Sequence, residues 1–138
     1  MAFKWDKSLE TGYEKVDKQH KMLAAAVNDL MEASSSGKGD REVLRTLEFL
    51  TNYTVQHFTD EENLQIMYEY PDYPNHKRIH EDFREKVGEL VRKVNETGPT
   101  EEIIAEVSSI ICAWLLEHIK GEDFRMASYV KDTDAGLK

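Results

Sequence analysis

The sequence has little of the residues that crosslink small folds or interrupt helices. Its 138 residues include one cysteine, three prolines and seven glycines. The single cysteine, Cys112, cannot form an internal disulfide, and its apolar neighbours predict a buried, reduced thiol without a catalytic role. We see no internal repeats and no alternating apolar pattern of the kind typical of strands. These absences favour an all-α protein with a single domain over residues 1–138.

Long apolar runs and clusters of basic residues are also missing. The longest apolar run, residues 110–116, is far too short to span a bilayer, and the first residues lack the apolar stretch of a signal peptide. The formal charge of -9 argues against nucleic acid or an anionic membrane as a partner, because both require clustered Lys and Arg. We therefore expect a cytoplasmic protein whose domain makes no direct membrane contact.

Three short breaks divide the chain into four segments with helical periodicity. The breaks centre on Gly37, Pro71 and Gly98, and each is rich in residues that end or start helices. Asp40 and Thr100 are expected to cap the helices that follow, because their side-chain oxygens can accept backbone N–H groups. Within each segment the apolar residues recur at three- and four-residue steps, on one helix face. Four such faces predict an antiparallel up-down-up-down four-helix bundle.

Apolar residues also precede the first helix. Phe3 and Trp5 are too apolar for a free tail, so residues 1–16 should form an ordered N-terminal arm packed on the bundle. Gly12 would serve as the bend of this arm, because glycine adopts backbone conformations that other residues avoid. The helical bundle and a short C-terminal helix are expected over about residues 17–131.

All five histidines of the chain lie on the predicted buried faces, together with one glutamate. A lone histidine on an apolar face is usually a hydrogen-bonded core residue, but five separate explanations are less economical than one shared cause. A buried layer of imidazoles and a carboxylate is costly without partners, and a bound metal is the simplest compensation. Two pairs lie four residues apart, a spacing that suits adjacent ligands on one helix. The candidate ligands are His20, His57, Glu61, His76, His80 and His118.

Asp123 offers a second carboxylate, five residues after His118. On a continuous α-helix a five-residue step turns a side chain about 140° away from the ligand face. Gly121 can relieve this by ending or bending the helix. Spacing alone nevertheless favours a solvated helix-end residue for Asp123.

The ligand candidates occur in four motifs that resemble the bacterial hemerythrins. The motifs are Asp17-Lys18-Gln19-His20-Lys21, His57-Phe58-Thr59-Asp60-Glu61-Glu62, His76-Lys77-Arg78-Ile79-His80, and Trp114-Leu115-Leu116-Glu117-His118-Ile119 followed by Asp123. The similarity runs from Trp5 to about Tyr129, and no ligand position of the family is missing. Seven ligands in order over four helices form a specific pattern.

The resemblance implies a cofactor of two iron ions. The three later histidines would bind one iron and the two earlier ones the other: His76, His80 and His118, then His20 and His57. Glu61 and Asp123 would bridge the irons together with an oxo or hydroxo group, which overrides the spacing argument against Asp123. One position then stays open on the iron with two histidines, and O2 would bind there.

A nitrogen-rich ligand set agrees with reversible O2 binding. Iron accepts imidazole and carboxylate together, whereas structural zinc normally closes at four ligands. Fewer carboxylates should stabilise high-valent iron less, which favours binding over oxidation of a substrate, so we expect no enzymatic activity. A dry apolar pocket would protect bound oxygen. Its candidates by position are Trp114, Ile119, Leu23, Phe58 and Leu115.

The family includes freestanding O2 carriers and O2-sensing domains of signalling proteins such as methyl-accepting chemotaxis receptors. The Met-Ala start and the polar residues 131–138 favour a sensing domain with a covalently linked signalling domain upstream. The alternatives are a freestanding carrier or storage protein, a di-iron reductase of peroxide or nitric oxide, and an iron-storage module.

Overall fold

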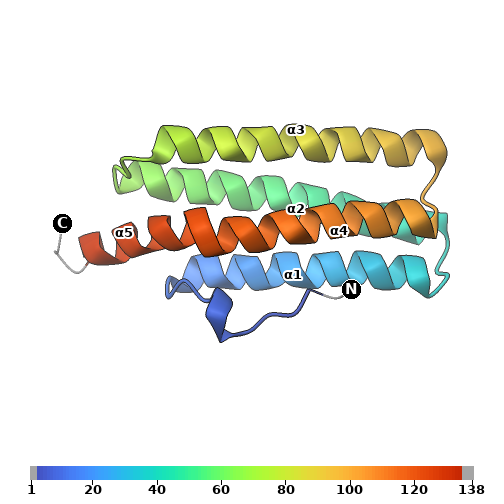
Figure 1. Cartoon of the computed structure of the whole chain (residues 1–138), viewed down its shortest axis with the longest axis horizontal. Coiled ribbons are helices and arrows are strands. Elements are labelled where there is room, and N and C mark those ends of the chain that lie inside the picture. Colours follow the sequence, from blue (N-terminus) through green and yellow to red (C-terminus); the bar gives the residue numbers. More distant parts are fainter. Residues whose placement is uncertain (1–2, 135–138) are drawn as a thin grey trace.

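The computed structural model describes residues 3–134 and has no strand within that range. Its α-helices are α1 (Glu14–Ser35), α2 (Asp40–Met67), α3 (Tyr73–Thr97), α4 (Glu101–His118) and α5 (Phe124–Asp134). A 3-10 turn, η1 (Lys7–Leu9), precedes α1, and a π-helical turn, η2 (Ile119–Asp123), joins α4 to α5. The four long helices alternate in direction, which confirms the predicted up-down-up-down bundle with its arm and short C-terminal helix (Figure 1).

The apolar faces predicted from periodicity form the core between the four helices. α1 packs on α2 and α4, and α3 packs on the same two helices. Periodicity also places Leu64 on the buried face of α2 and Trp114 on that of α4, but both are half-buried, and Gln65 takes the core position next to Leu64. The predicted buried positions of α2 recur about every 3.5 residues on average, whereas an α-helix has about 3.6 residues per turn. This small difference accumulates along the helix, so the next core position after Glu61 comes four residues later instead of three. Among the described residues, none of the helices has the length and hydropathy needed to cross a bilayer.

The two predicted helix caps differ in outcome. Thr100 caps α4, since its Oγ1 accepts the backbone N–H of Ile103 at 3.2 Å. The prediction for Asp40 is wrong, because Asp40 is the first residue of α2 and Gly39, with a φ of 93°, holds the cap position. A glycine at positive φ lets the chain turn directly into the helix. The carboxylate of Asp40 then lies in the first turn, where the helix dipole favours negative charge.

The described part of the N-terminal arm is ordered and lies along α1. The backbone N–H of Phe3 donates to Oδ1 of Asn28 at 2.7 Å, and Nδ2 of Asn28 donates to the Phe3 carbonyl at 2.9 Å. α1 already begins at Glu14, inside the segment expected for the arm. Residues 1–2 and 135–138, at the ends of the predicted domain, lie outside the described residues.

The arm turns into α1 through a clamp around Thr11 and Gly12. Asp17 accepts the backbone N–H and the hydroxyl of Thr11 at 2.8 and 2.7 Å, and the N–H of Gly12 at 3.0 Å. From α5, Nζ of Lys131 donates to the Thr11 carbonyl at 2.7 Å. Gly12 has a φ of 87°, so it is the bend that the sequence predicts. The clamp therefore ties the arm to the first and last helices together.

Alanine at Gly12 and at Gly88 should change stability in opposite directions. Gly12→Ala should lower the free energy of unfolding by roughly 1–2 kcal/mol, because a Cβ is unfavourable at positive φ and would lie 2.5 Å from Nζ of Lys131. Gly88→Ala should raise it by roughly 0.5–1 kcal/mol, because Gly88 lies within α3 and a Cβ there meets open space. Urea unfolding of both variants at equal metal content tests this. Changes of the same sign would contradict the assigned role of Gly12.

Candidate metal centre

The seven predicted ligand residues come together in one buried layer of the bundle. None of them is more than 5% exposed. They come from every element around the core: His20 from α1, His57 and Glu61 from α2, His76 and His80 from α3, His118 from α4, and Asp123 from η2. The structure thus places all of the predicted ligands at a single site.

The π-helical turn η2 brings Asp123 into this layer. A π-turn closes hydrogen bonds over five residues instead of four, so residues five apart fall on the same side of the helix. Asp123 follows His118 by five residues and is 1% exposed. The expectation from spacing alone, a solvated helix-end residue, is therefore wrong. The helix also does not end at Gly121, because η2 continues directly into α5.

The ligand atoms form two groups that share both carboxylates. One group comprises Glu61, His76, His80, His118 and Asp123, and the other His20, His57, Glu61 and Asp123. Within each group the ligand atoms lie within 4.8 Å of one another. An ion about 2.1 Å from each ligand separates opposite ligands by about 4.2 Å. Each group therefore has the dimensions of a site for one metal ion.

The Glu61 carboxylate directs one oxygen toward each group. Its Oε1 lies 3.1 Å from Nε2 of His76 and 3.1 Å from Nε2 of His80. Its Oε2 lies 3.0 Å from Nε2 of His57 and 3.6 Å from Nε2 of His20. A carboxylate arranged in this way suits a bridge between two cations.

The two oxygens of the Asp123 carboxylate also face different ligand groups. Its Oδ1 lies 3.2 Å from Nε2 of His76 and 3.2 Å from Nε2 of His118. Its Oδ2 lies 2.9 Å from Nε2 of His20. All five imidazoles therefore present Nε2 to the shared carboxylates, which leaves Nδ1 for contacts outside the layer.

Several polar atoms in the layer make no hydrogen bond, although Nε2 of His76 lies 3.1 Å from both Oε1 of Glu61 and Nε2 of His118. The atoms that make no hydrogen bond include Nε2 of His20, Nε2 of His57, Oε2 of Glu61 and both carboxylate oxygens of Asp123. Buried polar groups without partners cost free energy, and this cost is avoided where their lone pairs bind cations. The unsatisfied nitrogen and oxygen atoms therefore fit a pair of metal ions.

The electrostatics of the layer follow from the packing of imidazoles against carboxylates. Burial alone would lower the pKa of His20, but contacts with Asp123 and Glu61 raise it to about 9. For His76, burial likewise lowers the pKa, but contacts with the same two carboxylates outweigh it and raise the pKa to about 10. Burial would raise the pKa of Glu61, yet its contacts with His57, His20 and His76 hold it well below the usual value. Without metal, protons on the imidazoles thus balance the two carboxylates.

Apolar and aromatic side chains cover this layer. Phe58 stacks on His80 with ring centroids 3.9 Å apart, and Trp114 stacks on His118 at 4.4 Å. Both rings therefore lie against the group with three histidines. Trp114 is half-buried and lines a hollow of about 260 Å³ beside His118. The other predicted pocket residues, Leu23, Leu115 and Ile119, are fully buried.

The residues that contact the outer nitrogens of two ligands were not predicted from the sequence. Nδ1 of His57 lies 2.7 Å from Oε1 of Gln19, and Nδ1 of His80 lies 2.8 Å from Oε2 of Glu62. Trp5, predicted only to pack on the bundle, lies with its ring centroid 6.4 Å from that of His20. Gln19 and Glu62 each adjoin a candidate ligand in the sequence, which is the one signal that marks them. Periodicity does not reveal contacts between helices.

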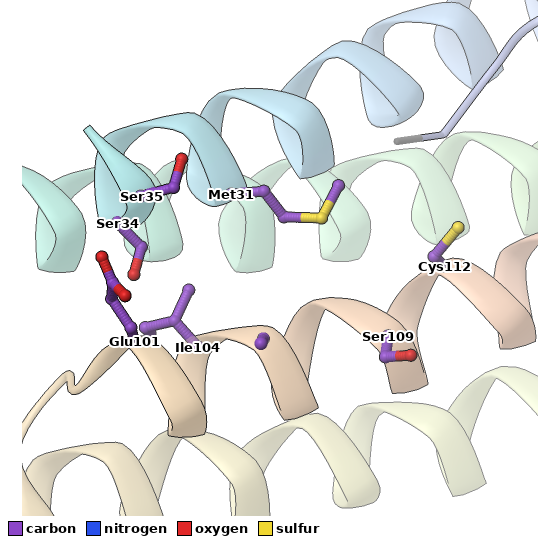
Figure 2. Close-up of a pocket in the computed structure, with 8 residues that line it drawn as sticks. Met31, Ser34, Ser35, Glu101, Ile104, Ser109 and Cys112 are labelled. Carbon is purple, nitrogen blue, oxygen red and sulfur yellow. The ribbon is translucent and has the colours of Figure 1, made fainter. Parts of the chain in front are cut away.

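A separate hollow of about 400 Å³ lies between the end of α1 and the first turns of α4 (Figure 2). Met31, Ser34, Glu101 and Cys112 are among its lining residues, and none of the seven ligand candidates lines it. Cys112 is buried, and burial raises the pKa of its thiol. The prediction of a buried thiol is confirmed, and the hollow is distinct from the metal centre.

Comparison with known proteins gives one consistent result. Residues 11–130 match the hemerythrin HHE cation binding domain family. The chain is 34% identical to a myohemerythrin from Theromyzon tessulatum, over 89% of each chain, and 32% identical to a bacteriohemerythrin from Pseudomonas aeruginosa, over 96% of this chain and 89% of the relative. The crystal structure of a hemerythrin point mutant superposes with a TM-score of 0.82 at 25% identity, covering 94% of this chain and 98% of that one. The predicted resemblance is confirmed.

Glu61→Ala should empty the site and destabilise the protein. Glu61 belongs to both ligand groups, so its loss should lower metal content at both positions. Removing one partner from a buried set of charges should also lower the free energy of unfolding by roughly 3–5 kcal/mol. Metal analysis and urea unfolding measure the two effects. Glu48→Ala, on the exposed face of the same helix, is the control and should change neither by a measurable amount. Retention of two metal ions by Glu61→Ala would contradict the assignment.

Metal uptake should release protons. The pKa values of about 9 and 10 mean that His20 and His76 are cationic near neutral pH in the metal-free protein. An imidazole must lose its extra proton before it can bind a metal ion, so binding at about pH 8 should release about two protons per chain from these imidazoles. Both values lie above the ordinary pKa of histidine, so metal affinity should rise with pH through this range. A zinc titration in weak buffer with a pH indicator measures the release. Uptake without proton release would contradict these pKa shifts.

Proposed function

The chain belongs to the hemerythrin family, whose domain binds a di-iron centre, and from this premise we propose that it binds O2 reversibly. The observation that carries the proposal is the pair of ligand groups that share both carboxylates, with three histidines in one group and two in the other. Reversible binding requires an open coordination position on one of the two metal ions. The two ligand groups share both carboxylates but differ in their number of histidines. The ion in the group with two histidines would therefore have one protein ligand fewer than the other.

We assign the ligands on the same basis. His76, His80 and His118 would hold one iron, His20 and His57 would hold the other, and Glu61 and Asp123 would bridge them together with an oxo or hydroxo group. Counting the two carboxylates and the bridge, the first iron would have six ligands and the second five. The split of the Glu61 and Asp123 oxygens between the two groups supports the bridging role. The two irons, when bound, supply the electrons that O2 takes up and returns.

The residues of the chain set the conditions for that exchange. Five imidazoles and two carboxylates are an N-rich set with fewer anionic donors than the ferritin-like di-iron sites have, which supports binding without oxidation of a substrate. Leu23, Leu115 and Ile119 are fully buried and apolar, so they are suited to excluding water from the open position. A binding protein, and not an enzyme, is the function that this arrangement favours.

We further propose that O2 occupancy is sensed through the N-terminal arm, as in a chemotaxis receptor with a linked signalling domain. Asp17 lies one turn before His20 in α1 and holds Thr11 and Gly12 of the arm. Lys131 holds Thr11 from α5, the helix that follows Asp123. A metal ligand therefore lies within or next to each helix that clamps the arm. Movement of either ligand between liganded and unliganded states would act on the same clamp.

Exposure of the reduced protein to air tests the O2-binding function. We expect two irons per chain, a nearly colourless anaerobic diferrous form, and a visible absorption band that appears with air and disappears again under argon. The band should return over repeated cycles, because reversible binding leaves the irons reduced after release. A zinc content of one per chain, or an absorption band that appears with air and does not disappear under argon, would contradict the proposal. Steady turnover of peroxide or nitric oxide would instead favour a reductase.

Hydrogen exchange tests the sensing role. The amides of Thr11 and Gly12, both bonded to Asp17, should exchange at different rates in the diferrous and oxygenated forms. Amides near Thr100, at the opposite end of the bundle, are the control and should not differ. Lys131→Met removes the link to α5 and should reduce the difference at Thr11 without changing iron content. Identical exchange in the arm in both states would favour a freestanding carrier.

A further inference from the structure

The ligand His57 is the start of a hydrogen-bonded chain that runs to the protein surface. Its Nδ1 lies 2.7 Å from Oε1 of Gln19, and Nε2 of Gln19 donates to Oδ2 of Asp60 at 2.8 Å. The other carboxylate oxygen of Asp60 accepts Nε2 of Gln56 at 3.0 Å. His57 is buried, Gln19 and Asp60 are half-buried, and Gln56 is exposed. The chain links α2 to α1 beside His20, the other histidine of the same ligand group.

The direction of every hydrogen bond in this chain follows from Asp60. An ionised carboxylate can only accept, so the amide groups of Gln19 and Gln56 must both turn their NH2 toward it. Gln19 is then left with its carbonyl oxygen toward His57. An acceptor at that position requires a proton on Nδ1 of His57. Nε2, 3.0 Å from the Glu61 carboxylate, therefore keeps its lone pair for a metal ion.

We propose that Gln19 and Asp60 are positioning residues that fix the tautomer of His57 and thereby hold the metal ion of the two-histidine group. The inference rests on the proposed function only in taking His57 as a ligand. Outer partners of this kind orient the imidazole and change metal affinity by about 10- to 100-fold. The effect is local, because the chain contacts no imidazole of the other group through these bonds.

The interposed amide also distinguishes His57 from His80. Nδ1 of His80 meets a carboxylate directly, Oε2 of Glu62 at 2.8 Å, with Arg84 at 3.4 Å from the same oxygen. A direct carboxylate draws the imidazole proton and makes the ligand more basic, which favours the ferric ion. Gln19 fixes the tautomer of His57 while keeping the negative charge one residue away. The metal ion in the two-histidine group should consequently be the easier of the two to keep ferrous.

Two variants separate tautomer control from charge. Asp60→Asn can donate as well as accept, so Gln19 is free to turn and His57 loses its imposed tautomer. The double variant Gln19→Glu with Asp60→Asn retains all three hydrogen bonds and the net charge, but places the carboxylate directly on His57. Asp82→Asn is the control, because Asp82 is exposed and pairs with Arg78 on the surface of α3.

The experiment measures zinc binding, the His57 tautomer and the reduction potential of the iron-loaded protein. In Asp60→Asn we expect roughly 10-fold weaker binding of one of the two zinc ions, and a mixed His57 tautomer in ¹H–¹⁵N spectra of the metal-free protein. The double variant should restore both and shift the potential to a more negative value, which a purely structural contact would not do. Asp82→Asn should match the unmodified protein.

Three results would overturn the proposal: unchanged zinc affinity and tautomer in Asp60→Asn, equal weakening of both zinc ions, or failure of the double variant to restore zinc binding. The first two measurements use the zinc-loaded and the metal-free protein. The proposed role of Gln19 and Asp60 can therefore be disproved while O2 binding is confirmed. O2 binding can likewise be disproved while the proposed role of Gln19 and Asp60 is confirmed. The two proposals are therefore tested separately.

Discussion

The rest of the structure depends on the burial of two carboxylates among five imidazoles in one layer of the core. Such a layer is unfavourable unless cations or protons compensate the charges. Glu61 and Asp123 each direct one oxygen to either ligand group, so two cations satisfy both carboxylates at once. Outside the layer the core of the bundle is mainly apolar, and its helices cannot shift without breaking these contacts. The metal centre thus fixes the alignment of the helices as much as the helices position the ligands.

The π-helical turn is the local departure from regular structure that this layer requires. An α-helical continuation after His118 would direct Asp123 away from the core, and the shared carboxylate would be lost. One wider turn corrects the direction and leaves α5 to continue the helix. π-turns are rare in proteins, and those that do occur are often found at functional sites. The same turn connects a bridging ligand to the helix that carries Lys131, and so to the clamp on the arm.

The surroundings of the two ligand groups differ more than the ligands themselves. Phe58 and Trp114 stack on histidines of the three-histidine group, and Glu62 meets His80 directly. The two-histidine group has a neutral amide, Gln19, on His57, and Trp5 of the arm near His20. The group to which we assign O2 binding is therefore the one in contact with the arm. Binding and sensing would then share a single side of the centre.

The sequence by itself determined the helical class, the bundle topology and the identity of six of the seven residues that the structure brings together, whereas Asp123 was predicted only through the resemblance to the hemerythrins and against its spacing. Hydrophobic periodicity records which face of each helix is buried, and polar residues on such a face stand out against it. Tertiary structure alone decided the π-turn at Asp123, the cap at Gly39, the exchange of Leu64 for Gln65 in the core, and the contacts of Gln19 and Glu62. The last two of these features depend on how far one helix is displaced or rotated against another. Periodicity within a single helix contains no information on that displacement, because it is set by packing between segments distant in the chain.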